Sequence, residues 1–317
     1  MRLSEISAAF AAFMLAAPAA ADRLPAVRSE QGDASLHVEV VDITPRFLAF
    51  YDAARGVADP AARFALWQEH YGFAAVPPGP RGEEMARRLL DQGWSRYEAG
   101  LPTIRLGAAA FGSDPIDTLR AIARLLEADR PLNVRLVAYV GAFDGNAFTA
   151  GAGGAPTVNF PVEMDAEARR PIMAHEFTHA VHIQLAGLSG GWERSIAETL
   201  MQEGLAVHTS REVVPGRPLT AYIEHQPGWW ARAGERKAAI LRGILPALES
   251  KDGETVFRFT MGTGPGGIDR EAYAAGYWVV EQLRAEGMTL GQIARIGEAD
   301  MARVARGAIE RMLAAQG

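Results

Sequence analysis

Two histidines four residues apart, with a glutamate directly after the first, carry the strongest chemical signal in the chain. They are His175, Glu176 and His179, in the stretch HEFTH. On a helix, residues at this spacing lie about 40° apart around the axis and one turn apart along it. Two imidazoles placed in this way converge on one tetrahedral Zn²⁺, and Glu176 can reach a water at the metal without binding the metal itself. The spacing therefore predicts a zinc site on a helix.

The residues around this motif favour that interpretation over a helix whose histidines only fill the core. On a helical wheel, an apolar group lies opposite His175, formed by Met173, Phe177, Ala180 and Val181. The helix is therefore expected to bury that stripe and to turn its histidines the other way.

A catalytic zinc ion takes three protein ligands, so a third ligand is expected downstream. The stretch SIAETLMQEGLAVH offers Glu198 and Glu203. About 140° separates these two on a helix, so only one can face the metal. Glu203 shares its face with Leu200 and Val207, which is the side expected to turn toward the core and the HEFTH helix. This position favours Glu203 as the third ligand. Gly204 directly after it is unfavourable in a helix, and its presence makes sense if two helices approach closely at that point.

Three further histidines lie close by in the sequence. His182 is on the same face as His175 but two turns away, so it is expected to line the cleft or to be exposed rather than to bind the metal. His208 and His225 could stabilise an oxyanion in a reaction, or they could be surface residues.

The composition narrows the class of metal site. The chain has no cysteine, so its zinc must be held by histidine and carboxylate groups. Its formal net charge is −6 over 317 residues, and no dense group of lysines and arginines suggests a nucleic-acid partner.

The N-terminus, MRLSEISAAFAAFMLAAPAAADR, has the pattern of a secretory signal. Arg2 gives a short positive region, an apolar run follows, and small residues precede a cleavage site after Ala21. The alternative, a membrane anchor, is disfavoured because the apolar run is shorter than the roughly 20 residues that span a bilayer. We expect residues 1–21 to be a signal peptide and the mature protein to be periplasmic or secreted, with no membrane segment.

The remaining pattern predicts an α+β fold that is mostly helical. Short strands are expected at 36–43, 134–140 and 157–160, and helices over most of 46–128. The HEFTH helix is expected to begin near Arg170 with Pro171 in its first turn, and to be followed by a long helical C-terminal part. The expected domains are a mostly helical N-terminal region, 22–130, and a catalytic domain, 131–317. The strand at 157–160 could offer an edge with which an extended peptide pairs.

HEFTH followed by QEGLAVH resembles the gluzincin superfamily of zinc peptidases. More closely, HEFTH, ETLMQEGLAVH and AAGYWVVEQL together resemble a bacterial family of predicted Zn-dependent proteases, over roughly residues 133–300.

The resemblance implies roles for particular residues. His175 and His179 would be zinc ligands, Glu203 the third ligand and Glu176 the catalytic carboxylate. The ligand spacing usual in gluzincins falls on Glu198 instead, which leaves that residue as an alternative ligand or as a carboxylate that orients a ligand imidazole.

A tyrosine usually donates a hydrogen bond to the oxyanion in such enzymes. The stretch AAGYW makes Tyr277 the first candidate and Tyr273, one turn earlier, the second.

The expected function is therefore an exported peptidase that uses one Zn²⁺ and acts on a peptide or protein. The alternative is a zinc-binding scaffold without catalytic activity, which would have no need of Glu176. A weaker alternative, a polysaccharide-binding protein, is prompted by the adjacent Trp229 and Trp230. The pattern predicts neither the cleavage specificity nor the oligomeric state.

Overall fold

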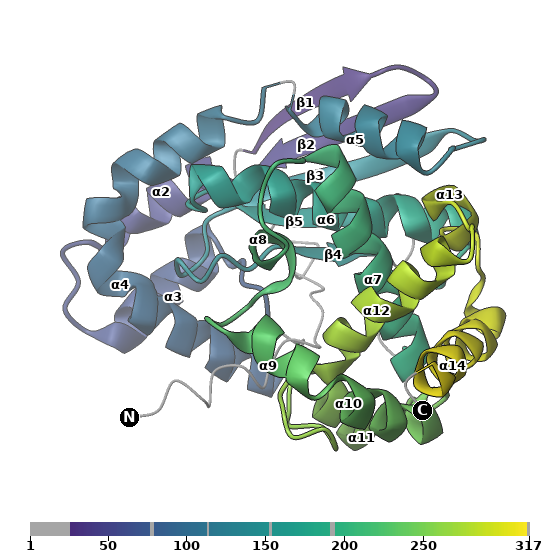
Figure 1. The fold of residues 1–317 in the computed structure, drawn as a ribbon. Coiled ribbons are helices and arrows are strands. Elements are labelled where there is room, and N and C mark those ends of the chain that lie inside the picture. The colour runs from purple at the N-terminus through teal and green to yellow at the C-terminus, as the bar shows by residue number, and fades with distance from the viewer. Residues whose placement is uncertain (1–25, 77–78, 113, 152–153, 191–193, 316–317) are drawn as a thin grey trace. The chain divides into compact units, whose positions relative to one another are not determined.

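The computed structural model describes residues 26–76, 79–112, 114–151, 154–190 and 194–315 (Figure 1). The predicted signal peptide, 1–21, lies outside the described residues. Over these ranges, no helix combines the length and the hydrophobicity needed to cross a bilayer. The described chain is mostly helical with one five-stranded mixed sheet, so the predicted α+β class is confirmed.

The chain forms two compact units. Of the described residues, the sheet unit contains those within 26–117 and 133–169, and the helical unit contains those within 118–132 and 170–315. Two helices, α5 (Asp114–Leu125) and α6 (Ala166–Ala186), each contribute residues to both units. The domain limits predicted from the sequence, 22–130 and 131–317, stay a prediction.

The sheet has the strand order β1-β2-β3-β5-β4. The strands are β1 (Val27–Gly32), β2 (Leu36–Asp42), β3 (Leu132–Tyr139), β4 (Phe148–Ala150) and β5 (Thr157–Pro161). Strands β2, β3 and β5 correspond to the three predicted strands, whereas β1 and β4 were not predicted. Strand β5 pairs in parallel with β3 and antiparallel with β4. The expectation that residues 157–160 offer a free edge is therefore wrong, because β4 covers residues 157–159.

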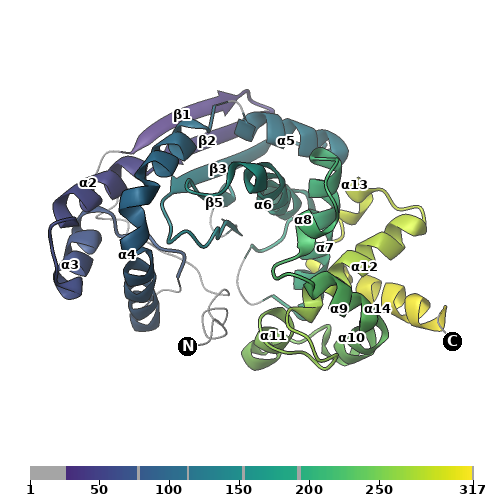
Figure 2. The same cartoon turned by 60° about the vertical axis from the view of Figure 1, so that its left-hand side comes forward.

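Three helices of the sheet unit pack together around an aromatic core. They are α2 (Thr44–Ala54), α3 (Pro60–His70) and α4 (Pro80–Ala109), which Figure 2 shows grouped together. Asp59 caps the start of helix α3, because its side chain accepts hydrogen bonds from the backbone N–H groups of Ala61 and Ala62. Pro60 is the first residue of the helix. The ring of Phe47 contacts the rings of Tyr71 and Tyr97 edge to face, at centroid distances of 5.5 and 4.8 Å.

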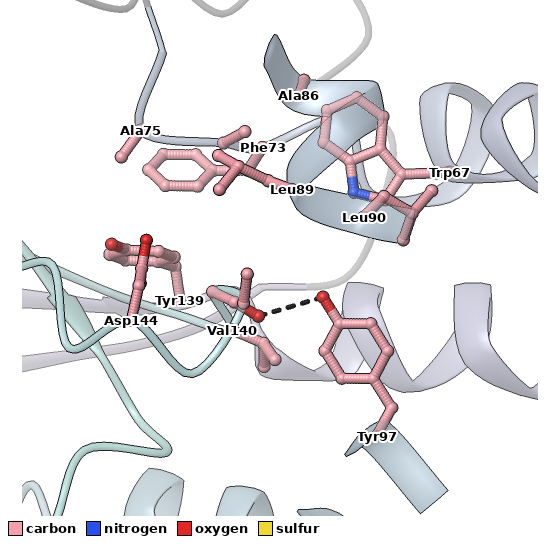
Figure 3. Close-up of a pocket in the computed structure, with 13 residues that line it drawn as sticks. Trp67, Phe73, Ala75, Ala86, Leu89, Leu90, Tyr97, Tyr139, Val140 and Asp144 are labelled. Atoms are coloured by element: carbon pink, nitrogen blue, oxygen red, sulfur yellow. Dashed lines mark hydrogen bonds between the residues drawn. The ribbon is translucent and has the colours of Figure 1, made fainter. Parts of the chain in front are cut away.

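A small cavity lies beside this aromatic core (Figure 3). Its volume is about 30 Å³, enough for a water molecule. Trp67, Phe73, Tyr97 and Tyr139 are among its lining residues. The hydroxyl of Tyr97 donates a hydrogen bond to the carbonyl of Gly141 at 3.0 Å, which ties α4 to the loop after β3. The cavity is thus a gap in the packing of a core whose elements are joined by hydrogen bonds.

The helical unit is built around two helices, α7 (Ile196–Val213) and α12 (Glu271–Ala285). Figure 1 shows α12 beside α7, with α10 and α14 packed around the pair. The surrounding helices are α8 (Thr220–Ile223), α9 (Trp229–Glu235), α10 (Lys237–Ile244), α11 (Gly253–Thr260), α13 (Leu290–Ile293) and α14 (Glu298–Ala314). On α7, every residue from Ile196 to Ser210 except Glu203 is buried. Helix α7 is therefore enclosed by protein on nearly all sides.

Two glycines allow α7 and α12 to touch through their backbones. A Cβ atom added to Gly204 would lie 2.1 Å from the carbonyl oxygen of Gly276, and one added to Gly276 would lie 2.3 Å from the carbonyl oxygen of Leu200. Real Cβ atoms do not come this close, so both positions require glycine. The contact brings the turn that carries Glu203 against the first turns of α12.

We predict that Gly204→Ala destabilises the protein by on the order of 3 kcal/mol, because α7 and α12 must move apart to admit the methyl group. Thermal and denaturant unfolding would measure the change. Gly234→Ala is the matched control, since Gly234 is exposed on α9 and its added Cβ meets nothing within 4 Å. The control should unfold like the parent or be slightly more stable. Parent-like stability of Gly204→Ala would contradict the close contact.

Candidate metal centre

Helix α6 carries the HEFTH motif and begins earlier than predicted. The side chain of Asp165 accepts a hydrogen bond from the backbone N–H of Glu167 at 2.8 Å, which caps the helix. The helix therefore starts at Ala166 rather than near Arg170, and Pro171 lies inside it. The proline was a misleading marker of the helix start, because Asp165 supplies the capping group five residues before the predicted start.

Helices α6 and α7 together place three donor groups around one point. The Nε2 atoms of His175 and His179 lie 3.1 Å apart. From α7, Oε2 of Glu203 lies 3.2 Å from Nε2 of His175, and Oε1 lies 3.7 Å from Nε2 of His179. The consecutive helices α6 and α7 thus bring the predicted ligands together.

These distances fit a tetrahedral zinc site. Ligand bonds of about 2.0–2.1 Å at tetrahedral angles hold donor atoms about 3.4 Å apart, which is within the observed range. Two imidazoles and one carboxylate are also the donor types that suit Zn²⁺. Three protein donors is the number found in catalytic rather than structural zinc sites.

The protonation states of two of the three donors agree with metal binding. Burial raises the pKa of Glu203, but the imidazoles of His179 and His175 outweigh this effect and lower the pKa to about 2. Burial lowers the pKa of His179 to about 3, so its ring is neutral at pH 7. Zinc binds deprotonated ligands, so a carboxylate and a neutral imidazole require no proton loss on binding. For the third donor, burial lowers the pKa of His175, but its hydrogen bond to Glu203 outweighs this effect and raises the pKa above the usual value, so this ring would release a proton when a metal binds.

Glu176 lies beside the donors without completing the set. One of its carboxylate oxygens and one ring nitrogen of each histidine all lie within 4.8 Å of one another. By this distance Glu176 could also reach a metal. Glu203 lies 3.2 and 3.7 Å from the two imidazoles, and the side chain of Glu176 leaves α6 about 100° around the axis from His175, so we assign the ligand position to Glu203 and the position next to the metal to Glu176. Glu176 is also buried, with 8% of its surface exposed. This is the placement expected of a carboxylate that handles a proton near the metal.

Glu198 has a different role, at the start of α7. Its Oε2 accepts a hydrogen bond from the backbone N–H of Ser195, and the hydroxyl of Ser195 accepts one from the N–H of Glu198, both at 3.2 Å. This reciprocal pair is a capping box. The other oxygen, Oε1, lies 3.2 Å from Nζ of Lys251. The structure thus brings Glu203 to the histidines and uses Glu198 to begin the helix.

The two candidate tyrosines occupy different surroundings. The hydroxyl of Tyr277 accepts a hydrogen bond from Arg211 at 2.8 Å and donates one to Glu281 at 3.2 Å. Burial and the charges of Glu203 and Glu176, partly offset by nearby arginines, together raise the pKa of Tyr273 to about 12. Tyr273 is therefore the tyrosine whose pKa is affected by the acidic groups of the metal centre.

The other histidines are buried rather than exposed. His182 is 1% exposed, neither ring nitrogen has a hydrogen-bond partner among the described residues, and burial lowers its pKa to about 3. The ring of His208 stacks on that of Tyr277 at 4.5 Å, and its Nε2 donates to the carbonyl of Tyr277. The expectation that His182 or His208 lies on the surface is wrong, because α6 and α7 are enclosed by other elements.

His225 and the tryptophan pair also pack within the helical unit. Nε2 of His225 lies 2.8 Å from a carboxylate oxygen of Asp269, whose carbonyl accepts a hydrogen bond from Nε1 of Trp229 at 2.9 Å. The ring of Trp230 contacts those of Tyr277 and Trp278. The two tryptophans therefore form no exposed aromatic platform for a polysaccharide.

Two arginines near the centre were not predicted. The charge of Arg270 acts on His175 and Glu203, and that of Arg194 acts on His179. Neither lies in a recognisable motif. Arg270 precedes the AAGYW stretch, and proximity to that stretch is the only signal in the sequence that could have indicated it.

We predict that Glu203→Ala lowers zinc affinity by more than about 100-fold, because loss of groups that merely orient ligands already costs 10- to 100-fold. Metal content after dialysis against a graded chelator would measure the change. Glu198→Ala is the matched control: it should retain zinc and lose about 1 kcal/mol of stability through the broken capping box. Zinc loss in the control with zinc retention in Glu203→Ala would reverse the ligand assignment.

One family model and one solved structure are similar to parts of this chain. Residues 147–301 match the family model described as "Predicted Zn-dependent protease (DUF2268)". Among solved structures, an aminopeptidase N family protein from Idiomarina loihiensis is similar at 11% identity and a TM-score of 0.35, over 91% of this chain and 42% of that one. No curated protein matches the chain. The resemblance carried by HEFTH, ETLMQEGLAVH and AAGYWVVEQL is thus confirmed as one to a family of predicted Zn-dependent proteases.

Proposed function

We propose that the protein is a zinc-dependent peptidase whose His175, His179 and Glu203 hold one Zn²⁺. The observation that carries the proposal is the convergence of two ring nitrogens from α6 and one carboxylate from α7, at distances of 3.1–3.7 Å, with the carboxylate of Glu176 beside them. The match of residues 147–301 to a family of predicted Zn-dependent proteases supports it.

The reaction is hydrolysis of a peptide bond. A zinc ion held by His175, His179 and Glu203 would supply Lewis acidity, which would polarise a carbonyl and lower the pKa of water to about 7. Glu176 accepts the proton of the attacking water and passes it to the leaving amine. Glu176 is buried, so few solvent molecules can take its proton. Its carboxylate therefore exchanges protons with the reacting groups.

Tyr273 is the group we assign to the developing oxyanion. Its raised pKa keeps the hydroxyl protonated at neutral pH, so that it can donate a hydrogen bond. Tyr277 already exchanges hydrogen bonds with Arg211 and Glu281. This difference favours Tyr273, the second of the two candidates from the sequence.

We predict that Glu176→Gln lowers kcat for peptide hydrolysis about 100- to 10,000-fold while zinc content stays unchanged, because the amide cannot accept the proton. Turnover of a fluorogenic peptide library by the zinc-loaded protein and metal analysis of the same sample would measure both. Unchanged turnover would remove Glu176 from the mechanism. Zinc binding by the parent protein without hydrolysis of any peptide would favour the scaffold alternative.

In the same assay, Tyr273→Phe tests the oxyanion assignment. Loss of one oxyanion donor lowers kcat about 100-fold or more with little change in KM. Tyr277→Phe is the comparison variant, and a larger loss of kcat there than in Tyr273→Phe would return the role to Tyr277.

We also propose that the peptidase is exported, on the basis of the signal-like pattern in residues 1–21. The mature protein should then begin at Asp22. Cell fractionation followed by mass spectrometry of the N-terminal peptide would measure this, and recovery of the intact chain from the cytoplasm alone would contradict export. The substrate would be a peptide or protein of the same compartment.

A further inference from the structure

Arg270 lies at the start of α12 in an unfavourable backbone conformation. Its φ and ψ angles are +56° and +37°, in the left-handed region. A residue with a side chain costs about 1–2 kcal/mol there. Arg270 is also the residue that precedes the first turn, yet its side chain makes no capping hydrogen bond, and a cation is disfavoured at the N-terminal end of a helix. Local folding thus gives no reason for an arginine at this position.

The guanidinium is held in place by an aromatic ring rather than by a carboxylate. It lies over the ring of Tyr273, 4.0 Å from the centroid. Within the described part of the chain, no carboxylate forms an ion pair with it. The adjacent acids are engaged elsewhere: Asp269 pairs with His225, and Glu271 accepts a hydrogen bond from the backbone N–H of Ile268. Arg270 therefore keeps its hydrogen-bond donors available.

The position of this cation is next to the metal centre. The contact between Gly204 and Gly276 sets the first turns of α12 against the turn of α7 that carries Glu203. Tyr273, which lies under the guanidinium, is on one of those turns. In agreement with this placement, the charge of Arg270 acts on both His175 and Glu203.

Arg194, also near the centre, shows the contrast. Its Nη1 donates a hydrogen bond to Oε1 of Gln202 at 3.0 Å, so Arg194 links the start of α7 to the segment before it. Arg270 makes no such link. A half-buried guanidinium that forms no ion pair beside a metal site has its natural partner in an anionic group of the ligand, and a carboxylate matches its planar pair of donors.

We propose that Arg270 binds a carboxylate of the substrate close to the scissile bond, so that the enzyme prefers peptides with negative charge at that point. The proposal rests on the peptidase function proposed above. The carboxylate is either the free C-terminus of the peptide, which would make the enzyme remove C-terminal residues, or an acidic side chain within a longer chain. The ring of Tyr273 positions the guanidinium through the cation–π contact.

The test is a binding measurement that needs no turnover. Zinc-loaded Glu176→Gln protein is titrated by calorimetry with three peptides of one sequence: the free acid, its C-terminal amide, and an amide that carries one internal glutamate. The free acid or the glutamate peptide should bind about 10- to 100-fold more tightly than the plain amide, the range expected for a charged hydrogen-bonded pair. The peptide that gains affinity identifies the source of the carboxylate. Equal affinity for all three peptides would overturn the proposal.

The variant is Arg270→Asn in the same background. Asparagine tolerates the left-handed backbone and is a preferred residue at a helix start, so this variant should fold with equal or higher stability. It should lose the preference for the charged peptide and bind the plain amide as before. Arg270→Lys, which keeps the charge but not the paired donors, should retain part of the preference.

Arg236→Gln is the matched control, because Arg236 is an exposed arginine at the start of α10 and its loss changes the net charge equally. It should keep the full preference. A preference that survives Arg270→Asn, or disappears in Arg236→Gln, would overturn the proposal. Since the parent's turnover is measured separately, a protein that binds the charged peptide selectively but hydrolyses nothing would refute the peptidase function and leave the carboxylate site intact.

Discussion

The backbone contact between Gly204 and Gly276 is the constraint on which the metal centre depends. It sets the axial position and the rotation of α7 against α12, and both helices carry residues of the centre next to the contact: Glu203 on one side and Tyr273 on the other. A side chain at either glycine would force the helices apart and so move Glu203 relative to the two histidines. The third ligand and the neighbouring tyrosine are therefore positioned by a packing interaction that involves no side chain at all.

Charge balance around the donors is the second determinant. Glu203 is ionised and His179 is neutral before any metal arrives, because the imidazoles lower the pKa of Glu203 and burial lowers that of His179. The hydrogen bond to Glu203 raises the pKa of His175, so a metal would displace a proton from that ring. The ion would bring two positive charges, and Glu203 and Glu176 supply two negative ones. The arginines near the centre then leave an excess of positive charge on that side of it. An environment of this kind attracts anionic groups of a ligand rather than repelling them.

Sequence patterns predicted the metal centre better than the elements around it. The HEFTH spacing is local, so helix geometry alone brings His175 and His179 together, and the glycine after Glu203 indicated a close helix contact that the structure contains. The preference for Glu203 over Glu198 rested on a comparison of helix faces. In the structure α7 is buried on nearly all sides, so the decisive difference is the capping box that engages Glu198. The pattern Ser-x-x-Glu at residues 195–198 is the sequence signal of that capping box.

Features that depend on tertiary contacts could not be predicted in this way. The short strand β4 has three residues and little pattern of its own, yet it removes the free edge expected at β5. The burial of His182 and His208 follows from the elements packed around α6 and α7, because neither residue differs in sequence from a surface histidine. The same limit applies to Arg270, whose importance comes from a backbone conformation and an absent ion pair among the described residues, neither of which has a sequence signature.

The enclosure of α7 also bears on how a bound ion could leave. Between Ile196 and Ser210, only Glu203 is not buried, so the backbone that carries the third ligand cannot fray without disrupting the core of the helical unit. The helix start is fastened as well, by Ser195 and Glu198. Escape of the ion through local opening of α7 would then be as slow as unfolding of that core. The lifetime of the holoprotein would be a property of the hydrophobic packing as much as of the coordination bonds.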